Sequence, residues 1–241
     1  MIRNLLHAIE TRHELIAGEF ATWKSVSDIQ QIPVDLIVLY HTVEKKISRV
    51  GSLLPIENAN SVVQEMCERI PIQEIHVPVF AGICGTEPVQ FFPMLFRNLV
   101  RAGVIGVQNF PSIGLIDGTF RYNLESVHLG VKCEEEAMTT ATHNGLEIIP
   151  FVFNQYEALA MAKAGAKIII LDLGFRSWDY DIHAEMAQYI DRIQSIGTLI
   201  NFLYPEVKLL VYSMYREIEQ YVERLLPQMP YIAGLYRSIP I

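Results

Sequence analysis

The sequence lacks the residues and motifs that several common protein classes require. Cysteine occurs only three times in 241 residues, at Cys67, Cys84 and Cys133, and no C-x-x-C pair is present. This pattern argues against a disulfide framework or a cysteine zinc site, and it favours a reduced, cytoplasmic protein. No H-x-H, H-E-x-x-H, G-x-G-x-x-G or Walker A motif occurs. A histidine-rich metal site and a nucleotide site of these kinds are therefore not expected.

Long apolar runs and clusters of positive charge are also missing. No run approaches the ~18 apolar residues of a membrane span. The N-terminal segment MIRNLLHAIETRHELIAG carries charges throughout, unlike a signal peptide. The net charge is −8 and no basic stripe occurs. We therefore expect neither nucleic acid nor a membrane as a partner.

The sequence does contain eight short apolar runs rich in β-forming residues. With 51% hydrophobic residues, the chain can form one large core. Near-continuous apolar runs of this length are typical of parallel strands that are covered on both faces. The runs are 13–20, 35–41, 77–84, 104–110, 147–153, 167–174, 207–213 and 230–236.

Helical stretches separate most of these runs. They are 59–70, 88–103, 133–145, 156–165, 183–203 and 216–228, and another helix is expected at 2–12. Alternating strands and helices predict an α/β fold, a (β/α)8 TIM barrel formed by one domain over residues 1–241. An open, doubly wound sheet is the alternative.

The last expected strand ends five residues before the last residue of the sequence, so this barrel would lack a final outer helix. An uncovered barrel wall would expose apolar surface. Either the N-terminal helix or a partner subunit would cover it, and we expect a homo-oligomer.

In a TIM barrel the site lies at the carboxyl ends of the strands. The loop after the fourth run, GVQNFPSIGLIDGTFR, places Asn109, Asp117 and Arg121 together. A structural alternative exists for each residue. Asn109 could satisfy loop backbone, Asp117 before a glycine could be a turn residue, and Arg121 could pair with Glu125 on a helix surface.

Other strand ends supply further candidates. Asp172 follows four apolar residues, where a carboxylate is solvated at the mouth or holds a cation or an arginine. Cys84 could act as a nucleophile if His41 lowered its pKa, or it could be a small buried side chain. Glu87 is a third acid/base candidate. No metal ligand set is predicted, although carboxylates at strand ends would suit Mg²⁺.

Four segments resemble the phosphoenolpyruvate hydrolase-like TIM-barrel family, also labelled a TIM-barrel signal-transduction family and similar to the barrel half of the Tm-1-like proteins. They are AGICGTEPVQFF (81–92), GVQNFPSIGLIDGTFRYNLE (106–125), PFVF (150–153) and MAKAGAKIII (161–170). The resemblance covers roughly the whole chain and is dense from 78 to 174; its specific element is NFP-x-x-GLIDG-x-FR. It implies an oligomeric barrel related to enzymes that make or break C–C or C–P bonds beside a 2-oxo acid.

The residues that match the family pattern lie mostly after the third and fourth runs. They are Gly82, Cys84, Gly85, Thr86, Pro88, Asn109, Phe110, Pro111, Gly114, Asp117, Gly118, Phe120, Arg121, Leu124, Glu125, Glu134 and Glu136. Elsewhere the chain departs from the family: Gly-rich loops are absent after the first two runs, and histidines are absent after the sixth and seventh. Because such loops cradle phosphate, their loss disfavours a phosphorylated substrate.

Bulky aromatic residues stand in several of these places. They indicate either a larger, more apolar ligand or a mouth filled by side chains, and they are Trp23, Trp178, Tyr180, Tyr212, Tyr215 and Tyr236.

Two functions follow as hypotheses. The first is a biosynthetic lyase or hydrolase that acts beside a carbonyl of a small 2-oxo-acid-like substrate. Arg121 would hold a carboxylate, Asn109 would stabilise an enolate, and an acid residue would move the proton. The predicted acids are Asp172, Asp117 and Glu87, with Cys84 and His41 in reserve. The predicted substrate contacts are Thr86, Phe110, Arg176, Tyr212, Tyr236 and Arg237.

The second hypothesis is a non-catalytic descendant of the family, which would serve as a binding or assembly subunit.

Overall fold

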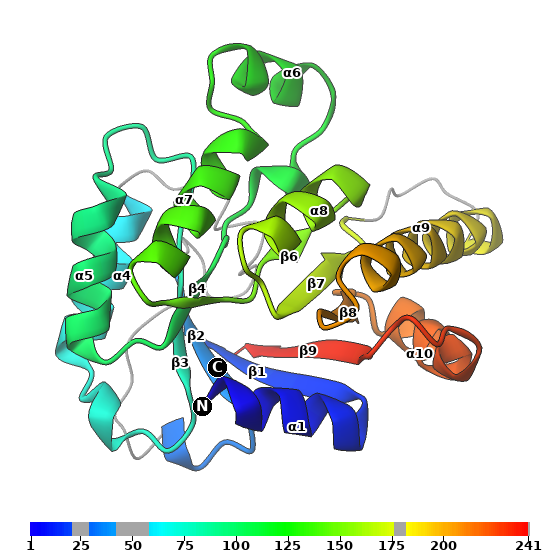
Figure 1. Cartoon of the computed structure of the whole chain (residues 1–241), viewed down its shortest axis with the longest axis horizontal. Helices are drawn as coiled ribbons and strands as arrows, with labels where there is room; N and C mark the ends of the chain where they lie inside the picture. The colour runs from blue at the N-terminus through cyan, green and yellow to red at the C-terminus, as the bar shows by residue number, and fades with distance from the viewer. Residues whose placement is uncertain (21–28, 42–57, 176–181, 241) are drawn as a thin grey trace.

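The computed structural model describes residues 1–20, 29–41, 58–175 and 182–240 (Figure 1). All strand pairs in these ranges are parallel. The strands are β1 (Glu14–Phe20), β2 (Leu36–Leu39), β3 (Val79–Gly82), β4 (Gly106–Gln108), β5 (Glu147–Ile148), β6 (Phe151–Val152), β7 (Ile168–Asp172), β8 (Lys208–Tyr212) and β9 (Gly234–Pro240).

Helices connect most of these strands. They are α1 (Ile2–Arg12), α4 (Ala59–Arg69), α5 (Phe92–Ala102), α6 (Gly118–Ser126), α7 (Val131–His143), α8 (Gln155–Lys163), α9 (Ile182–Leu203) and α10 (Arg216–Leu225). Three single 3-10 turns are η1 (Ile72–Glu74), η2 (Ile113–Leu115) and η3 (Leu226–Gln228). The helices expected at 2–12 and 183–203 match α1 and α9 to within a residue.

The sheet closes on itself because its two end strands are parts of one segment. The strand order is β5-β4-β3-β2-β1-β9-β8-β7-β6. Only Ile149 and Pro150 separate β5 from β6. The Ile149 N–H donates to Val107 O of β4 at 3.1 Å, and Pro150 O accepts from Ile170 N–H of β7 at 2.9 Å. Eight strand positions therefore form a closed ring, which is the predicted (β/α)8 barrel.

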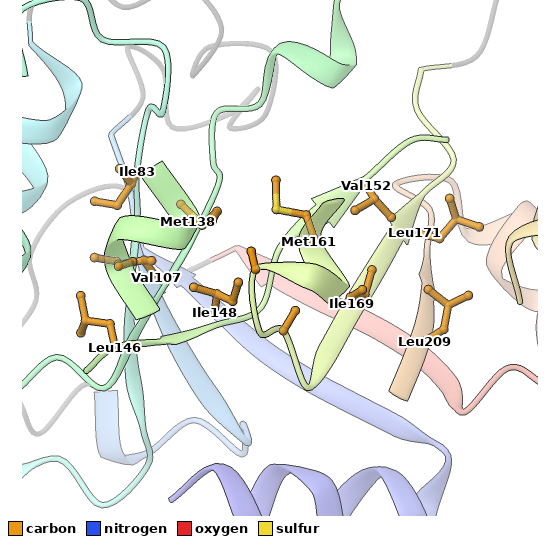
Figure 2. Packing of buried hydrophobic residues seen from close by; sticks show 14 of the residues in the cluster. Ile83, Val107, Met138, Leu146, Ile148, Val152, Met161, Ile169, Leu171 and Leu209 are labelled. Carbon is orange, nitrogen blue, oxygen red and sulfur yellow. The ribbon is translucent and has the colours of Figure 1, made fainter. Parts of the chain in front are cut away.

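The apolar side chains divide into an outer and an inner layer. Successive side chains of a strand point to opposite faces. In β7, Ile169 and Leu171 pack outward against the helices, whereas Ile168 and Ile170 pack inside the barrel. Figure 2 shows the outer layer, in which Met138 of α7 and Met161 of α8 lie among strand residues. This alternation decides which residues at the strand ends can reach the mouth.

Helix α1 closes the amino-terminal end of the barrel. Its Leu5 and Ile9 belong to the inner apolar layer. Its polar residues reach the starts of separated strands: Arg12 pairs with Asp35 before β2 at 2.5 Å, and Glu10 pairs with Lys208 of β8 at 3.2 Å. The N-terminal helix thus covers the barrel floor, whereas covering the outer wall was the role considered from sequence.

The last strand lies four residues later than the sequence pattern indicated. β9 pairs with β1 from Leu235 opposite Glu14 to Pro240 opposite Glu19. The predicted strand at 230–236 missed this because RSIP is polar and contains proline. Within the described residues, no outer helix follows β9.

We predict that α1 is an integral part of the barrel. Leu5→Ala and Ile9→Ala should each lower the free energy of unfolding by about 2–4 kcal/mol, because each leaves a cavity in the inner layer. Leu6→Ala removes a partly buried side chain of the same helix and should cost clearly less. Urea denaturation measures all three. Equal costs for the three variants would contradict the position of α1 across the barrel floor.

Candidate functional site

Polar side chains gather at the carboxyl ends of adjacent strands from β7 through β8, β9 and β1 to β2. Glu19 of β1 continues the inward series Leu15 and Ala17, and Asp172 of β7 continues Ile168 and Ile170. Both carboxylates therefore point into the barrel. They are 1% and 2% exposed, respectively. Burying a carboxylate is costly, so two inward acids at the mouth are a feature that packing alone does not require.

Asp172 lies opposite a tyrosine in the sheet, and a backbone N–H donates to its side chain. Its Oδ1 accepts from Gly174 N–H at 2.8 Å. In the sheet it lies opposite Tyr212 of β8, whose side chain belongs to the inner layer. His41 and Ser213 are buried and come just after the ends of β2 and β8. The described strand ends on this side thus carry two inward acids, with a buried histidine and a buried serine just beyond neighbouring strands.

Aromatic rings fill the barrel interior beneath these groups. Tyr212 and Tyr236 meet edge to face with ring centroids 5.8 Å apart, and Phe151 lies 5.7 Å from each. Phe110 lies 5.9 Å from Phe151 and 4.8 Å from Tyr40. These contacts make Phe110 and Tyr236, which are fully buried, part of the floor of the mouth. Tyr212 and Tyr236, which the sequence analysis noted as bulky departures from the family pattern, therefore partly fill the barrel.

Asn109 is a hydrogen-bonded link between strands. Its amide nitrogen donates to Phe151 O at 3.0 Å and to Glu134 Oε2 at 2.8 Å. Its amide oxygen accepts from Phe151 N–H at 2.7 Å. Asn109 is 1% exposed. The amide therefore satisfies backbone and a carboxylate, in agreement with the structural alternative considered from sequence.

Glu134 of α7 holds the loop that follows β4. Its Oε1 accepts from Ile113 N–H at 2.6 Å, and its Oε2 accepts from Ser112 Oγ–H at 2.9 Å and from Asn109. Complete burial raises the pKa of Glu134 to about 7, although these three hydrogen bonds oppose the shift. Gly85 packs against this residue, because a Cβ there would lie 2.8 Å from Glu134 Cα.

Arg121 is engaged on all sides by the protein. Its Nε donates to Glu125 Oε1 at 2.7 Å, and its Nη1 donates to Ile113 O at 2.8 Å. Its Nη2 lies 3.4 Å from Oε1 of Glu157, whose Oε2 accepts from Phe153 N–H at 2.7 Å. Burial raises the pKa of Glu157, against the opposing effects of Phe153 and Arg121. Arg121 thus forms the predicted helix-surface pair and also fastens the loop to α8. Asp117, in contrast, is exposed.

Cys84, Thr86 and Glu87 lie beyond β3. Asn60 of α4 clamps the backbone of Cys84, accepting from its N–H at 2.8 Å and donating to its oxygen at 3.0 Å. Cys84 Sγ lies 3.5 Å from Thr86 Oγ1, and burial raises the pKa of the thiol. An activated nucleophile needs a lowered pKa. Thr86 and Glu87 line a groove of about 400 Å³ between the β3–α5 loop and α7.

The predicted position of Arg237 at the mouth is wrong. Arg237 lies within β9, one residue after inward Tyr236, so its side chain faces the outer wall. There it contacts Glu14 at 2.6 Å, Glu223 at 2.9 Å and Glu219 at 3.2 Å. Arg176, Trp23, Trp178 and Tyr180 lie outside the described residues.

Sequence reasoning underestimated three acids. Glu134 was noted only as a match to the family pattern, yet it shares a helix face with Val131, Met138 and Ala141, a spacing that indicates burial. Glu157 stands three residues after the N-cap Asn154, in the pattern of a capping box. Glu19 was not among the predicted site residues, although the period of β1 directs it inward.

No metal centre is built by the described side chains. Across residues 1–20, 29–41, 58–175 and 182–240, no three His, Cys, Asp or Glu residues come together as a ligand set. A Mg²⁺ ion therefore enters no step below.

Comparison with known proteins places these features in context. The sequence model of the phosphoenolpyruvate hydrolase-like family matches residues 1–237. The ToMV resistance protein Tm-1(GCR237) of Solanum lycopersicum is 37% identical over 187 residues, which are 75% of this chain and 25% of that protein. The ToMV susceptible protein tm-1(GCR26) of the same plant is 42% identical over 144 residues, 58% of this chain and 19% of that protein. This chain thus spans about a quarter of these relatives or less.

A solved structure supports the fold. Type I 3-dehydroquinate dehydratase from Clostridium difficile, crystallised with covalently modified comenic acid, aligns with a TM-score of 0.52 at 13% identity. The alignment covers 93% of this chain and 83% of that one. None of the described helices is both long and apolar enough to cross a membrane.

The raised pKa of Glu134 predicts a pH-dependent stability. Because the folded pKa of about 7 exceeds the ordinary glutamate pKa of 4.5, the native state retains a proton that the unfolded chain releases. The free energy of unfolding should therefore fall as pH rises from about 4.5 to 7, by roughly 3 kcal/mol from this group. Glu134→Gln should remove that part of the slope, and exposed Glu136→Gln should retain it. Urea denaturation at pH 5, 6, 7 and 8 measures it. Parallel slopes for wild type and Glu134→Gln would refute the assignment.

The Arg121–Glu157 contact predicts coupled stabilities. Arg121→Ala leaves a buried carboxylate with fewer partners and should lower the free energy of unfolding by about 1–3 kcal/mol. In a Glu157→Gln background the same change should cost about 1 kcal/mol less. Exposed Arg97→Ala is the matched control and should change stability by at most about 0.5 kcal/mol. A double-mutant cycle measured by thermal unfolding tests this coupling. Additive effects of Arg121→Ala and Glu157→Gln on stability would contradict it.

Proposed function

The chain belongs to the phosphoenolpyruvate hydrolase-like family, and on that premise we propose that its barrel mouth moves a proton beside the carbonyl of a small 2-oxo-acid-like substrate. The observation that carries the proposal is the pair of inward, buried carboxylates, Glu19 and Asp172, at the carboxyl ends of β1 and β7. TIM barrels place their chemistry at this end. This proton transfer would be the first step of C–C bond cleavage, C–C bond formation or hydrolysis.

Asp172 is the proposed base. Gly174 N–H fixes its Oδ1, so the carboxylate keeps one orientation when a substrate enters. A base must lie within hydrogen-bond reach of the proton that it removes. Removal of a proton from the carbon beside the carbonyl leaves negative charge on the carbonyl oxygen. The Tyr212 hydroxyl or His41 would stabilise that oxygen by donating a hydrogen bond.

Glu19 is proposed as the second acid/base group. It lies on β1, two strand positions from β8 in the sheet order. Two acids in different surroundings can hold different protonation states, one accepting and the other donating a proton. The aromatic floor formed by Phe151, Tyr212 and Tyr236 limits how deeply a substrate enters. These features favour a small substrate.

Asn109 and Arg121 are assigned supporting roles in this proposal. Both are committed to protein groups by hydrogen bonds, so neither is used as an enolate or carboxylate ligand. They hold the β4 and β6 ends of the mouth instead. This revises the roles that the sequence motif suggested.

A non-catalytic binding subunit is the second candidate. It is favoured by one observation, the filling of the barrel interior by aromatic rings that contact one another. The names of the tomato relatives refer to virus resistance and susceptibility, which leaves a binding role open for this chain as well.

Hydrogen exchange tests the catalytic proposal. The protein is incubated in D2O with pyruvate, 2-oxobutanoate or oxaloacetate, and loss of the protons beside the carbonyl is followed by ¹H NMR. Asp172→Asn and Glu19→Gln should each slow enzymatic exchange about 10²–10⁴-fold. Asp117→Asn, an exposed acid of the family motif, is the control and should exchange at the wild-type rate.

Each outcome separates the two candidates. Exchange that persists in Asp172→Asn and Glu19→Gln would remove these acids from the chemistry. Tight binding of a 2-oxo acid by wild type without any exchange, measured by thermal shift, would establish the binding subunit instead.

A further inference from the structure

Helix α6 is oriented with its apolar stripe toward solvent. Phe120, Leu124 and Val127 follow the i, i+4, i+7 spacing that normally faces a core. Phe120 is 62% exposed and Val127 is 61% exposed, and the helix contains no buried residue. Tyr122, on another side of the helix, is 72% exposed. In Figure 1, α6 stands away from the sheet, beyond α7.

Polar contacts hold α6 rigidly in this position. Arg121 ties the helix to the Ile113 carbonyl and to Glu157 of α8. Glu125 accepts from Val131 N–H, the first residue of α7, at 3.2 Å. A nine-residue helix is not stable in water by itself, so these anchors keep it formed. The helix thus presents Phe120 and Val127 to solvent, while Arg121 and Glu125 anchor it to the preceding loop, α8 and the start of α7.

A groove of about 400 Å³ lies next to α6. It is bordered by His128 and Leu129, which follow α6 directly, and by Phe91 and Phe92 at the start of α5. Phe91 is itself exposed, as are Val89 and Met94 on either side of it. The same end of the molecule therefore carries a projecting apolar helix and an adjacent hollow with apolar residues on its edge.

The apolar area matches what a stable pair of subunits needs. At roughly 100 Å² for each exposed aromatic side chain and less for each aliphatic one, five exposed side chains present on the order of 400 Å²; they are Phe91, Phe120, Val89, Met94 and Val127. A specific interface buries about 800 Å² per partner, of which somewhat more than half is apolar. The polar rim of the groove, including Glu87 and Glu136, would supply the remainder.

We propose that α6 and this groove form a two-fold interface between two copies of the chain, with the apolar side chains of α6 of each copy seated in the groove of the other. A projecting element beside its own receptor is self-complementary, because rotation by 180° brings helix to groove twice. This pairing covers Phe120, Leu124 and Val127 together with Phe91. It is independent of the chemistry proposed for the barrel mouth.

Sedimentation velocity and light scattering between about 1 and 100 μM test the interface. Wild type should be a dimer, or a larger assembly built from dimers. Phe120→Asp and Val127→Asp should each raise the dimer dissociation constant at least about 30-fold, as expected for a residue at the centre of an interface. Circular dichroism confirms folding, which should persist because α6 buries no side chain.

Phe202→Asp is the matched control. Phe202 is 80% exposed near the end of α9, and α9 ends toward the amino-terminal side of the barrel, away from α6. This variant should associate like wild type. The proposal is overturned if wild type is monomeric over this range, if Phe120→Asp and Phe202→Asp weaken association equally, or if neither Phe120→Asp nor Val127→Asp weakens it.

Discussion

The hydrogen bonds between Asn109 and the backbone of Phe151 are the constraint on which the rest of the mouth depends. β4 and the β5–β6 segment are short, and Pro150 removes one backbone donor from the ladder. The Asn109 side chain replaces ladder contacts by bonding both Phe151 N–H and O. Glu134 then joins the amide to α7 and to the following loop. One buried asparagine and one buried acid thus close the barrel where its own strands are weakest.

This network explains why Asn109 and Arg121 of the NFP-x-x-GLIDG-x-FR motif form hydrogen bonds within the protein. Loop 109–117 cannot move without breaking bonds to Glu134, and Arg121 binds its carbonyl groups from the other side. A loop fixed at both ends can carry α6 in one orientation. These polar residues therefore have two structural roles. Asn109 and Glu134 link β4 to β6 and α7, and Arg121 fixes the position of α6, a helix that buries no side chain.

The fold was predictable because its signal is repeated, whereas the site depends on single residues. Eight apolar runs indicated eight strands, and no single error could change the architecture. Arg237 shows the difference: β9 extends past Tyr236, and a shift of one residue moves a side chain from the interior to the outer wall. Glu134 shows another limit, since an acidic run looks solvated unless the helix period is applied to each member. The place of α1 depends on the packing of Leu5 and Ile9 against the inner layer, a long-range contact that no local pattern reveals.

The sequence motif pointed to the β3 and β4 half of the barrel mouth as the site, whereas the inward buried acids lie in the other half. The half with the retained motif, β3 and β4, uses its polar groups on itself. The rewritten half, from β7 to β2, directs Asp172 and Glu19 inward and buries both. Burial of a carboxylate is costly, and buried acids at a barrel mouth are candidates for a functional site. Asp172 stands where the family usually has a histidine, so this strand end still carries an ionisable side chain; the proposed function rests on this acid and on Glu19.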